Sequence, residues 1–270
     1  MSVRSALEIT TLTDPGIVRS FNEDTIATEP DLGLALVADG MGGYKAGDVA
    51  SGMAATIMVS ELKRQLRETT PTENNITEIL ISSANRANRA IYQAAQASPQ
   101  HHGMGTTLVA AVFHDNRLHY SHIGDSRLYR LRRGKLKVLT QDHSILHEQV
   151  ALGLISNDDA KTSHNRNLVT RALGVEAQSQ CEAQSLVVEP GDIYLLCSDG
   201  LNDMVDDANI ELAMNALQAN LPLTARQLVM MANDNGGHDN ISAILIKVLA
   251  PFPAIEASGG MLSRLFGWLK

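Results

Sequence analysis

The sequence predicts an α+β fold built from helices and layered antiparallel sheets. The expected elements follow the order strand, helix pair, several strands, helix pair, strand, which is not the strict alternation of a parallel doubly wound sheet. Asp115-Asn116 and Arg133-Gly134 are turn dipeptides between short β segments, as in antiparallel hairpins. No repeat of solenoid length and no low-complexity tract interrupts this order.

The first part of the chain supplies strands and two long helices. Residues 7–12 and 34–38 are apolar runs of strand length. Residues 46–66 and 76–96 are predicted helices. The second is the clearer one, because its apolar residues recur every three or four positions: Leu80, Ala84, Ala87, Ile91 and Ala94.

The second part begins with β segments and returns to helices. The β segments are residues 106–113, 117–123, 127–131 and 135–139. Residues 143–168 are polar and irregular, with some helix expected. After a strand at 192–198, a third helix is marked by Ile210, Ala213, Met214, Leu217 and Leu221. A fourth begins at Pro222, and a last β segment ends at Pro251.

Composition excludes several classes of protein. A net charge of -8 and a pI near 5.6 argue against a nucleic-acid-binding face. No apolar run approaches the roughly 20 residues of a membrane-spanning helix, and the first residues do not resemble a signal peptide. Cys181 and Cys197 form no C-x-x-C pair, which argues against a disulfide framework or a thiolate zinc site. We therefore expect a cytoplasmic protein that binds no nucleic acid.

Residues 251–270 differ from the rest of the chain. Pro251, Pro253 and Ser258-Gly259-Gly260 make the segment linker-like, and residues 261–270 form a short amphipathic pattern with the only Trp. We favour a helix that docks on the domain. The alternative is a short anchor for a partner or a membrane surface.

Three aspartates stand at the ends of apolar runs. Asp39-Gly40 and Asp199-Gly200 each follow such a run, and Asp239 immediately precedes another. Each Asp-Gly pair alone is an ordinary turn dipeptide. A buried carboxylate, however, is costly unless it is paired or binds a metal, so three of them at strand ends outline a metal site.

Eight short motifs complete this pattern. They are Arg19-Ser20-Phe21-Asn22-Glu23-Asp24, Asp39-Gly40-Met41-Gly42-Gly43, Gly105-Thr106-Thr107, Gly124-Asp125-Ser126-Arg127-Leu128-Tyr129, Leu139-Thr140-Gln141-Asp142-His143-Ser144, Thr170-Arg171-Ala172-Leu173-Gly174, Ser198-Asp199-Gly200-Leu201 and Gly237-His238-Asp239-Asn240. Each alone is weak evidence. In order and spacing, over residues 5–250, they resemble the metal-dependent type 2C serine/threonine protein phosphatases, particularly short stand-alone bacterial members.

The resemblance implies a four-layer α/β/β/α sandwich with two central antiparallel sheets and metals in a cleft between them at one end. Residues 1–250 would form the catalytic domain, with a flap at about 144–168. Residues 251–270 would be a linker and tail.

The resemblance also implies roles for single residues. Asp39 would bridge two divalent ions. The Gly40 carbonyl would bind one of them, and Glu23, Asp199 and Asp239 would complete the protein ligands of the other.

Further roles concern water, substrate and a third ion. Asp24 would hydrogen-bond a metal-bound water, and Arg19 would hold the substrate phosphate. His164 falls in the flap where relatives often carry a substrate-side histidine. A third, weaker ion would be held by Asp125, Asp199 and Asp203.

The chemistry of these residue types agrees with the resemblance. Ligand sets made only of oxygen favour hard ions such as Mg²⁺ or Mn²⁺. Two such ions about 4 Å apart lower the pKa of a bridging water or hydroxide and present it to phosphorus in line, and Arg19 can hold phosphoryl oxygens bidentately. The expected reaction is direct hydrolysis of phosphoserine and phosphothreonine, with no covalent intermediate.

One position departs from part of the family. Several members have a histidine after the Asp-Gly pair, thought to protonate the leaving alkoxide, where this chain has Met41. A metal-bound water is our first choice for the general acid. We expect a monomer whose partners are phosphorylated proteins, among them a cognate Ser/Thr kinase and its substrates.

Two alternative functions are an inactive phosphatase fold and a different two-metal hydrolase. A phosphatase fold without activity, serving as a binding module, should lack an acidic ligand, but Glu23, Asp39, Asp199 and Asp239 are all present. A two-metal nuclease or phosphodiesterase is disfavoured by the negative net charge and the lack of a basic groove pattern. The remaining histidines form no ligand spacing in the sequence, and we interpret them as surface or hydrogen-bonded loop residues.

Overall fold

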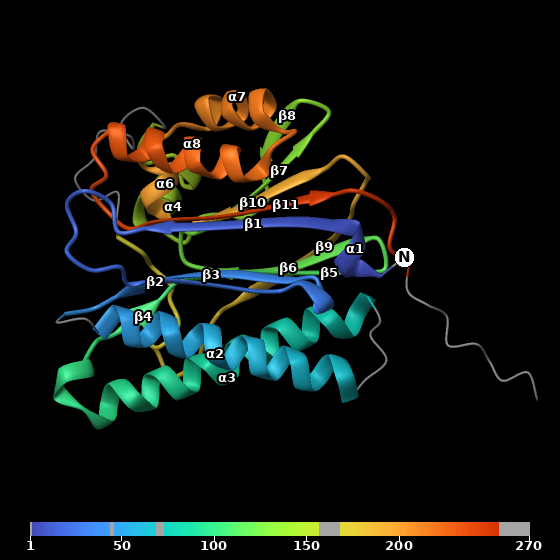
Figure 1. Ribbon diagram of the computed structural model, residues 1–270. Helices are drawn as coiled ribbons and strands as arrows, with labels where there is room; N and C mark the ends of the chain where they lie inside the picture. Colours follow the sequence, from blue (N-terminus) through green and yellow to red (C-terminus); the bar gives the residue numbers. More distant parts are fainter. Residues whose placement is uncertain (1, 44–45, 69–72, 157–167, 254–270) are drawn as a thin grey trace, which may run out of the picture.

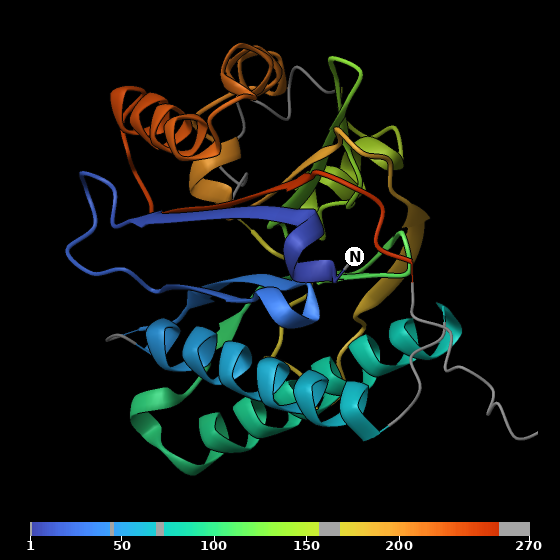
Figure 2. The ribbon, with the colours of Figure 1, turned by 45° about the vertical axis from the view of Figure 1, so that its right-hand side comes forward.

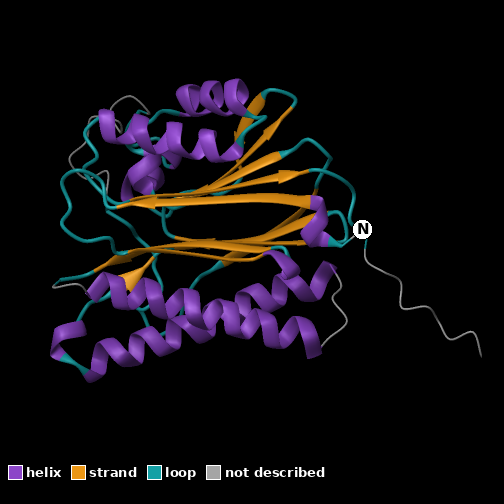
Figure 3. Ribbon diagram, viewed as in Figure 1, coloured by secondary structure: helices purple, strands orange, loops and turns teal. Residues whose placement is uncertain are grey.

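Two antiparallel sheets lie face to face in the middle of the molecule, with helices over the outer face of each (Figures 1 and 3). This computed structural model describes all residues except 1, 44–45, 69–72, 157–167 and 254–270. The α+β fold with its four-layer α/β/β/α order, predicted from the sequence, is confirmed.

The first sheet has the strand order β1-β11-β10-β7-β8. Its strands are β1 (Leu7–Asp14), β7 (Arg127–Arg132), β8 (Lys135–Val138), β10 (Ile193–Cys197) and β11 (Ile241–Val248). The first and last strands of the chain pair along their whole length, from Leu7 opposite Val248 to Asp14 opposite Ile241. Both ends of the chain thus contribute to one sheet.

The second sheet has the order β2-β3-β5-β6-β9, and the short β4 pairs with β3. Its strands are β2 (Asp24–Glu29), β3 (Leu34–Met41), β4 (Gly105–Thr106), β5 (Leu108–His114), β6 (Arg117–Ile123) and β9 (Glu182–Val187). Every pairing is antiparallel, as the hairpin dipeptides predicted.

The helices form two outer layers. The long pair α2 (Ala46–Glu68) and α3 (Glu73–Ala97) covers the second sheet, while α7 (Asp207–Leu217) and α8 (Leu221–Asp234) cover the first (Figure 1). The shorter helices are α1 (Val3–Ala6), α4 (Ile145–Ala151) and α6 (Asp199–Asn202), with 3-10 turns at η1 (Pro30–Leu32) and η2 (Pro99–His101).

Side chains of one strand face two different cores. In β3, Leu36 packs toward α2 and α3, whereas Val37 packs between the sheets, because successive side chains of a strand point to opposite faces. A third cluster, with Leu195 and Leu228, lies between the first sheet and α7 and α8. Strands buried on both faces explain the continuous apolar runs of the sequence.

The predicted hairpin turns adopt the conformation that their residues favour. Asp115 and Asn116 have φ of 47° and 57°, and Arg133 and Gly134 have φ of 52° and 79°. Positive φ at both central residues matches the right-handed twist of the flanking strands.

Three expectations about elements need correction. Strand β9 was not predicted, because it is a half-exposed edge strand and half of its residues are polar. The strand expected at 106–113 is interrupted at Thr107, whose Oγ1 accepts from the Asp39 N–H at 3.1 Å. Leu221 begins α8 and does not end the third helix, because Asn220 caps α8 by accepting from the Leu223 N–H.

Within the described ranges, no helix has both the length and the apolar character to cross a membrane. The amphipathic segment at 261–270 lies outside the described residues, so its docking or anchoring role stays a prediction.

Candidate metal centre

Acidic residues from both sheets converge at one end of the sandwich. The loop that joins β1 to β2 lies at this end (Figure 2). Asp24 begins β2 and stands directly opposite Asp39 of β3 in the strand register. The second sheet therefore contributes two adjacent carboxylates to this end, and Glu23 precedes them in the chain.

The first sheet contributes carboxylates through its own register. Cys197, the last residue of β10, lies opposite Arg127 at the start of β7 and Ala243 near the start of β11. Asp199, just after β10, therefore lies beside Asp125, just before β7, and beside Asp239, just before β11. Electrostatic interactions of Asp199 with Asp125 and Asp239 reflect this closeness.

Hydrogen bonds join the two sheets at this point. Ser198 Oγ donates to Asp24 Oδ2 at 2.7 Å and accepts from the Ser242 N–H at 3.0 Å. The Glu23 N–H donates to Asn240 Oδ1 at 2.7 Å. These bonds hold carboxylates from separate sheets in a fixed relation.

Burial and mutual repulsion disfavour the charged forms of these carboxylates. Asp24 and Asp125 are 9% and 6% exposed, and desolvation raises the pKa of each to about 7. The pKa values of Asp39 and Asp199 also lie well above their ordinary value, first from desolvation and then from neighbouring carboxylates. Such repulsion at neutral pH calls for a compensating positive charge.

Several oxygens of this cluster accept no hydrogen bond. Glu23 Oε1, Asp24 Oδ1 and Asp199 Oδ1 are buried and have no partner among the described residues. Buried polar atoms without partners are rare in folded proteins and mark places where an ion or a water binds. The donor set is oxygen only and anionic, which fits Mg²⁺ or Mn²⁺.

Gly40 fits closely against the start of α2. A Cβ on Gly40 would lie 2.1 Å from the Gly47 carbonyl oxygen and 2.6 Å from the Glu23 carbonyl oxygen. The Gly40 N–H donates to the same Glu23 carbonyl at 3.1 Å. Only glycine allows this approach, which keeps Glu23 beside Asp39 and Gly40.

Arg19 lies at the edge of the cluster. Its Nη2 donates to Asp239 Oδ2 at 2.7 Å, and its Nε donates to the His238 carbonyl at 3.4 Å, while half of the side chain remains exposed. Arg19 is thus the cation beside the carboxylates and is accessible to an anionic group from solution.

Two predicted site residues remain, Asp203 and His164, and the structure describes only the first of them. Asp203 follows α6, its N–H donates to the Asp199 carbonyl at 2.8 Å, and it interacts electrostatically with Asp125. His164 lies outside the described residues. The structure therefore brings the predicted metal ligands together, while their roles and the role of His164 stay predictions.

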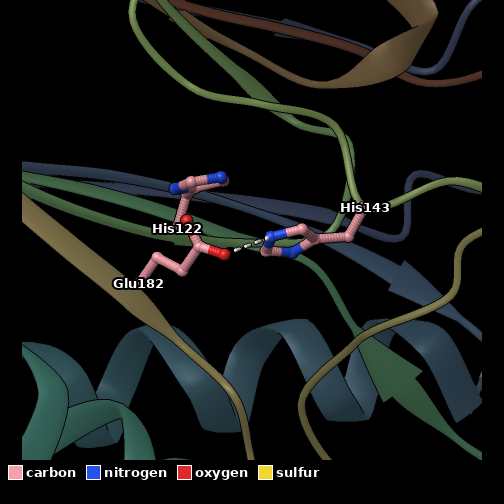
Figure 4. Close-up of side chains that lie close together, drawn as sticks. All are labelled: His122, His143 and Glu182. Atoms are coloured by element: carbon pink, nitrogen blue, oxygen red, sulfur yellow. Dashed lines mark hydrogen bonds and ion pairs between the residues drawn. The ribbon is translucent and has the colours of Figure 1, made fainter. Parts of the chain in front are cut away.

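A second cluster contains His122, His143 and Glu182 (Figure 4). The two rings stack with centroids 4.9 Å apart, and His143 Nε2 lies 3.3 Å from Glu182 Oε1. His143 Nδ1 accepts from the Gly124 N–H, so its Nε2 carries the proton that faces Glu182. His122 Nε2 donates to the Gln141 carbonyl at 2.9 Å.

This histidine cluster fits a hydrogen-bonded set better than a metal site. Burial lowers the pKa of both His122 and His143, which keeps them neutral. A metal on His143 Nε2 would have to displace the proton while Nδ1 still accepts from Gly124. We assign the cluster to holding the segment before the flap against β6 and β9. The expectation of surface or hydrogen-bonded loop residues thus fits His143, which lies in a loop, but not His122, which lies in strand β6.

Sequence reasoning missed part of the surroundings of the acidic site. Ser198, Ser242 and Asn240 hold the carboxylates in place, but only the motif positions of Ser198 and Asn240 drew attention to them. Glu182 gave no signal at all, because it lies on the unpredicted edge strand β9.

Comparison with known proteins agrees with this geometry. Residues 18–245 match the family model described as Protein phosphatase 2C. The serine/threonine phosphatase stp of Listeria innocua is 37% identical over 240 residues, which cover 87% of this chain and 93% of that protein.

Solved structures agree as well. The serine/threonine phosphatase PstP/Ppp of Mycobacterium tuberculosis superposes with a TM-score of 0.81 at 35% identity, covering 90% of this chain and 99% of the other. A structure of the PstP catalytic domain in complex with two manganese ions gives a TM-score of 0.80 at 33% identity, covering 90% and 99%.

The chain belongs to the protein phosphatase 2C family. The resemblance found in the sequence is therefore confirmed, as is the predicted enzyme class, a phosphoprotein phosphatase that depends on Mn²⁺ or Mg²⁺. Family membership and the oxygen-only donor set also agree with the predicted cofactor, two divalent cations.

Proposed function

We propose that this protein phosphatase hydrolyses phosphoserine and phosphothreonine in proteins by direct attack of water on phosphorus. The observation that carries the proposal is the group of buried carboxylates with partnerless oxygens at the junction of the two sheets. Two bound divalent ions would supply a water of lowered pKa and would neutralise phosphoryl oxygens.

Five protein groups would hold those ions. Asp39 lies centrally, with Asp24, Asp199 and Asp125 as its charged neighbours, and is the residue best placed to contact both ions. The Gly40 carbonyl would bind one ion. The other would take its protein ligands from Glu23, Asp199 and Asp239.

The residues around the ions would position the reactants. Arg19 would bind the phosphate through its planar guanidinium, which can donate two parallel hydrogen bonds to phosphoryl oxygens. Its present contact with Asp239 keeps the guanidinium beside the cluster. Asp24, held by Ser198, would accept a hydrogen bond from the attacking water and fix its orientation.

The proton for the leaving alkoxide needs another source. Met41 occupies the position where several family members carry histidine, and a thioether has no proton to donate. We propose that water in the ligand sphere of the ions fills this role. A third, weaker ion near Asp125, Asp199 and Asp203 is part of the same proposal, and so is substrate contact by His164 of the flap.

The protein substrates in the cell are the next part of the proposal. Relatives are named serine/threonine phosphatases, so we propose that this chain reverses the action of a cognate Ser/Thr kinase on that kinase and its substrates. The negative net charge of -8 argues against nucleic-acid substrates. The monomeric state, the cytoplasmic location, the 1–250 domain boundary and a membrane contact through the tail stay predictions.

Turnover of two substrates, with and without chelator, tests the proposal. With Mn²⁺, a phosphothreonine peptide should be hydrolysed and a phosphodiester should not, and excess chelator should abolish the activity. A preference for the diester would indicate a nuclease or phosphodiesterase. Absence of all turnover with Mn²⁺ bound would indicate a binding module. Full peptide turnover in chelator would contradict the metal site itself.

A further inference from the structure

Three apolar side chains project from one short loop beside Arg19. Ile17, Val18 and Phe21 are 69%, 60% and 56% exposed, and all lie between β1 and β2. Large apolar residues exposed singly are ordinary on protein surfaces, but three within five positions of one loop, beside the acidic site, indicate an interaction surface. We call residues 15–21 the apolar loop.

The backbone of the apolar loop is fixed at both ends. Asn240 is buried, and its side-chain amide donates to the Pro15 carbonyl at 3.0 Å and to the Phe21 carbonyl at 2.9 Å. The Ile17 and Val18 N–H groups donate to the Gly237 carbonyl at 3.0 and 3.2 Å. The exposed side chains are thus carried on a backbone that needs little ordering when a partner binds.

The loop also runs very close to the acidic site. Gly16 has φ of +76°, and a Cβ there would lie 2.4 Å from the Asp239 carbonyl oxygen. Asn240 joins the loop to the site itself, because its Oδ1 accepts from the Glu23 N–H. A shift of the apolar loop would therefore move the carboxylates of the acidic site. The loop backbone is thus restricted in position although its apolar side chains are exposed to solvent.

Arg19 sits within the apolar loop, between Val18 and Phe21, and contacts Asp239. A phosphate held by Arg19 brings the residues on either side of the phosphorylated residue over the same loop. The loop carries no acidic side chain, and Arg19 is its only charged residue. Its surface therefore suits an uncharged, apolar neighbour of the phosphate group.

We propose that the apolar loop selects substrates, by binding an apolar side chain close in sequence to the phosphoserine or phosphothreonine. This inference rests on the proposed function and names the substrate class of that site. Burial of one aliphatic side chain against three half-exposed ones should favour such a substrate about tenfold in kcat/KM. The effect should lie mainly in KM, because the contact stabilises the bound substrate and the transition state equally and so leaves kcat unchanged.

The test uses the Mn²⁺-loaded full chain and three substrates. Two phosphothreonine peptides differ only in carrying Leu or Ser in the two positions on each side of the phosphothreonine, and p-nitrophenyl phosphate has no flanking residues. The wild type should prefer the Leu peptide about tenfold. Ile17→Ser/Phe21→Ser should reduce the ratio toward one and leave p-nitrophenyl phosphate turnover unchanged.

Leu212→Ser/Leu223→Ser is the matched control, because these exposed apolar residues lie on α7 and α8, away from Arg19. It should keep the wild-type ratio. Equal turnover of both peptides by the wild type would overturn the inference, and so would an unchanged ratio in Ile17→Ser/Phe21→Ser. A parallel loss of p-nitrophenyl phosphate turnover would show that the loop serves the catalytic centre instead.

Other occupants of the apolar loop give different results. If a second copy of this chain covers it, sedimentation should show a wild-type dimer that Ile17→Ser/Phe21→Ser converts to monomer, which would contradict the inference. Failure of the proposed function is separate, because the wild type would then hydrolyse neither peptide nor p-nitrophenyl phosphate.

Discussion

The two ends of strand β10 each carry a carboxylate, but the partners of the two carboxylates differ. Asp192 precedes the strand and is 1% exposed. Arg132 donates to it from Nε at 2.7 Å and from Nη2 at 2.6 Å, and the Tyr194 hydroxyl and the Glu189 N–H donate as well. Both oxygens of this buried carboxylate thus accept hydrogen bonds, and the Arg132 guanidinium compensates its charge.

Asp199, at the other end of β10, has no such compensation. Its Oδ1 has no partner among the described residues, and its charged neighbours are Asp125, Asp203 and Asp239. Burying charge without pairing is costly. Six residues of chain therefore separate a carboxylate that is paired within the fold from one that lacks a pairing cation, which we propose binds a metal ion.

The largest effect is expected at Asp39, the centre of the unpaired group. Asp39→Asn should reduce turnover by at least about 10³, because one change would disturb both ions. The fold should survive, as judged by circular dichroism. Asp31→Asn is the control, since the Asp31 side chain is 72% exposed and pairs with Arg4 on the surface. Near wild-type turnover of Asp39→Asn with two ions bound would refute the central position of Asp39.

The two ends of β10 should respond oppositely to loss of charge. Asp192→Asn should lower the free energy of unfolding by about 3 kcal/mol, because the Arg132 guanidinium loses its charged partner. Asp199→Asn, compared in chelator, should leave that free energy equal or higher, because a repelled carboxylate is removed. Urea unfolding measures both. Equal destabilisation by the two changes would contradict the claim that Asp192 is paired and Asp199 is not.

A smaller effect is expected at Asp125, at the margin of the unpaired group. Asp125→Ala should reduce turnover of phosphoproteins while two ions remain tightly bound, because only the third ion is expected to depend on it. Equilibrium dialysis with Mn²⁺ reports the bound ions. If the two tight ions are lost from this variant, Asp125 belongs to the core set.

The smallest effect is expected at the tail. Deleting residues 255–270 should leave phosphopeptide turnover nearly unchanged, because the last strand, β11, ends at Val248. A docking helix would cost the domain at most a few kcal/mol when removed, whereas an anchor would cost only membrane or partner association. The single Trp268 reports the difference by its fluorescence. A large loss of turnover would instead assign the tail to the active site.

The same contrast explains what the sequence could predict. Asp39 and Asp199 were found because each ends an apolar run, and the runs themselves are buried on both faces. Arg132 and Asp192 gave no comparable pattern, because a compensating pair can come from any two neighbouring strands. Strand β9, with Glu182, was missed since an exposed edge strand needs no apolar alternation. Contacts such as Ser198 to Asp24 depend on how the sheets stack, which no local pattern encodes.

Mn²⁺ binding to the full chain, followed by titration calorimetry between pH 6 and 8, tests the central claim most directly. Two ions should bind per chain. Affinity should rise with pH, and protons should be released at pH 6, because burial and neighbouring carboxylates raise the pKa values of Asp39 and Asp199 well above their ordinary value and ions bind only ionised carboxylates. Binding of fewer than two ions, or binding that is independent of pH across this range, would contradict the claim that these carboxylates are kept unpaired for cations.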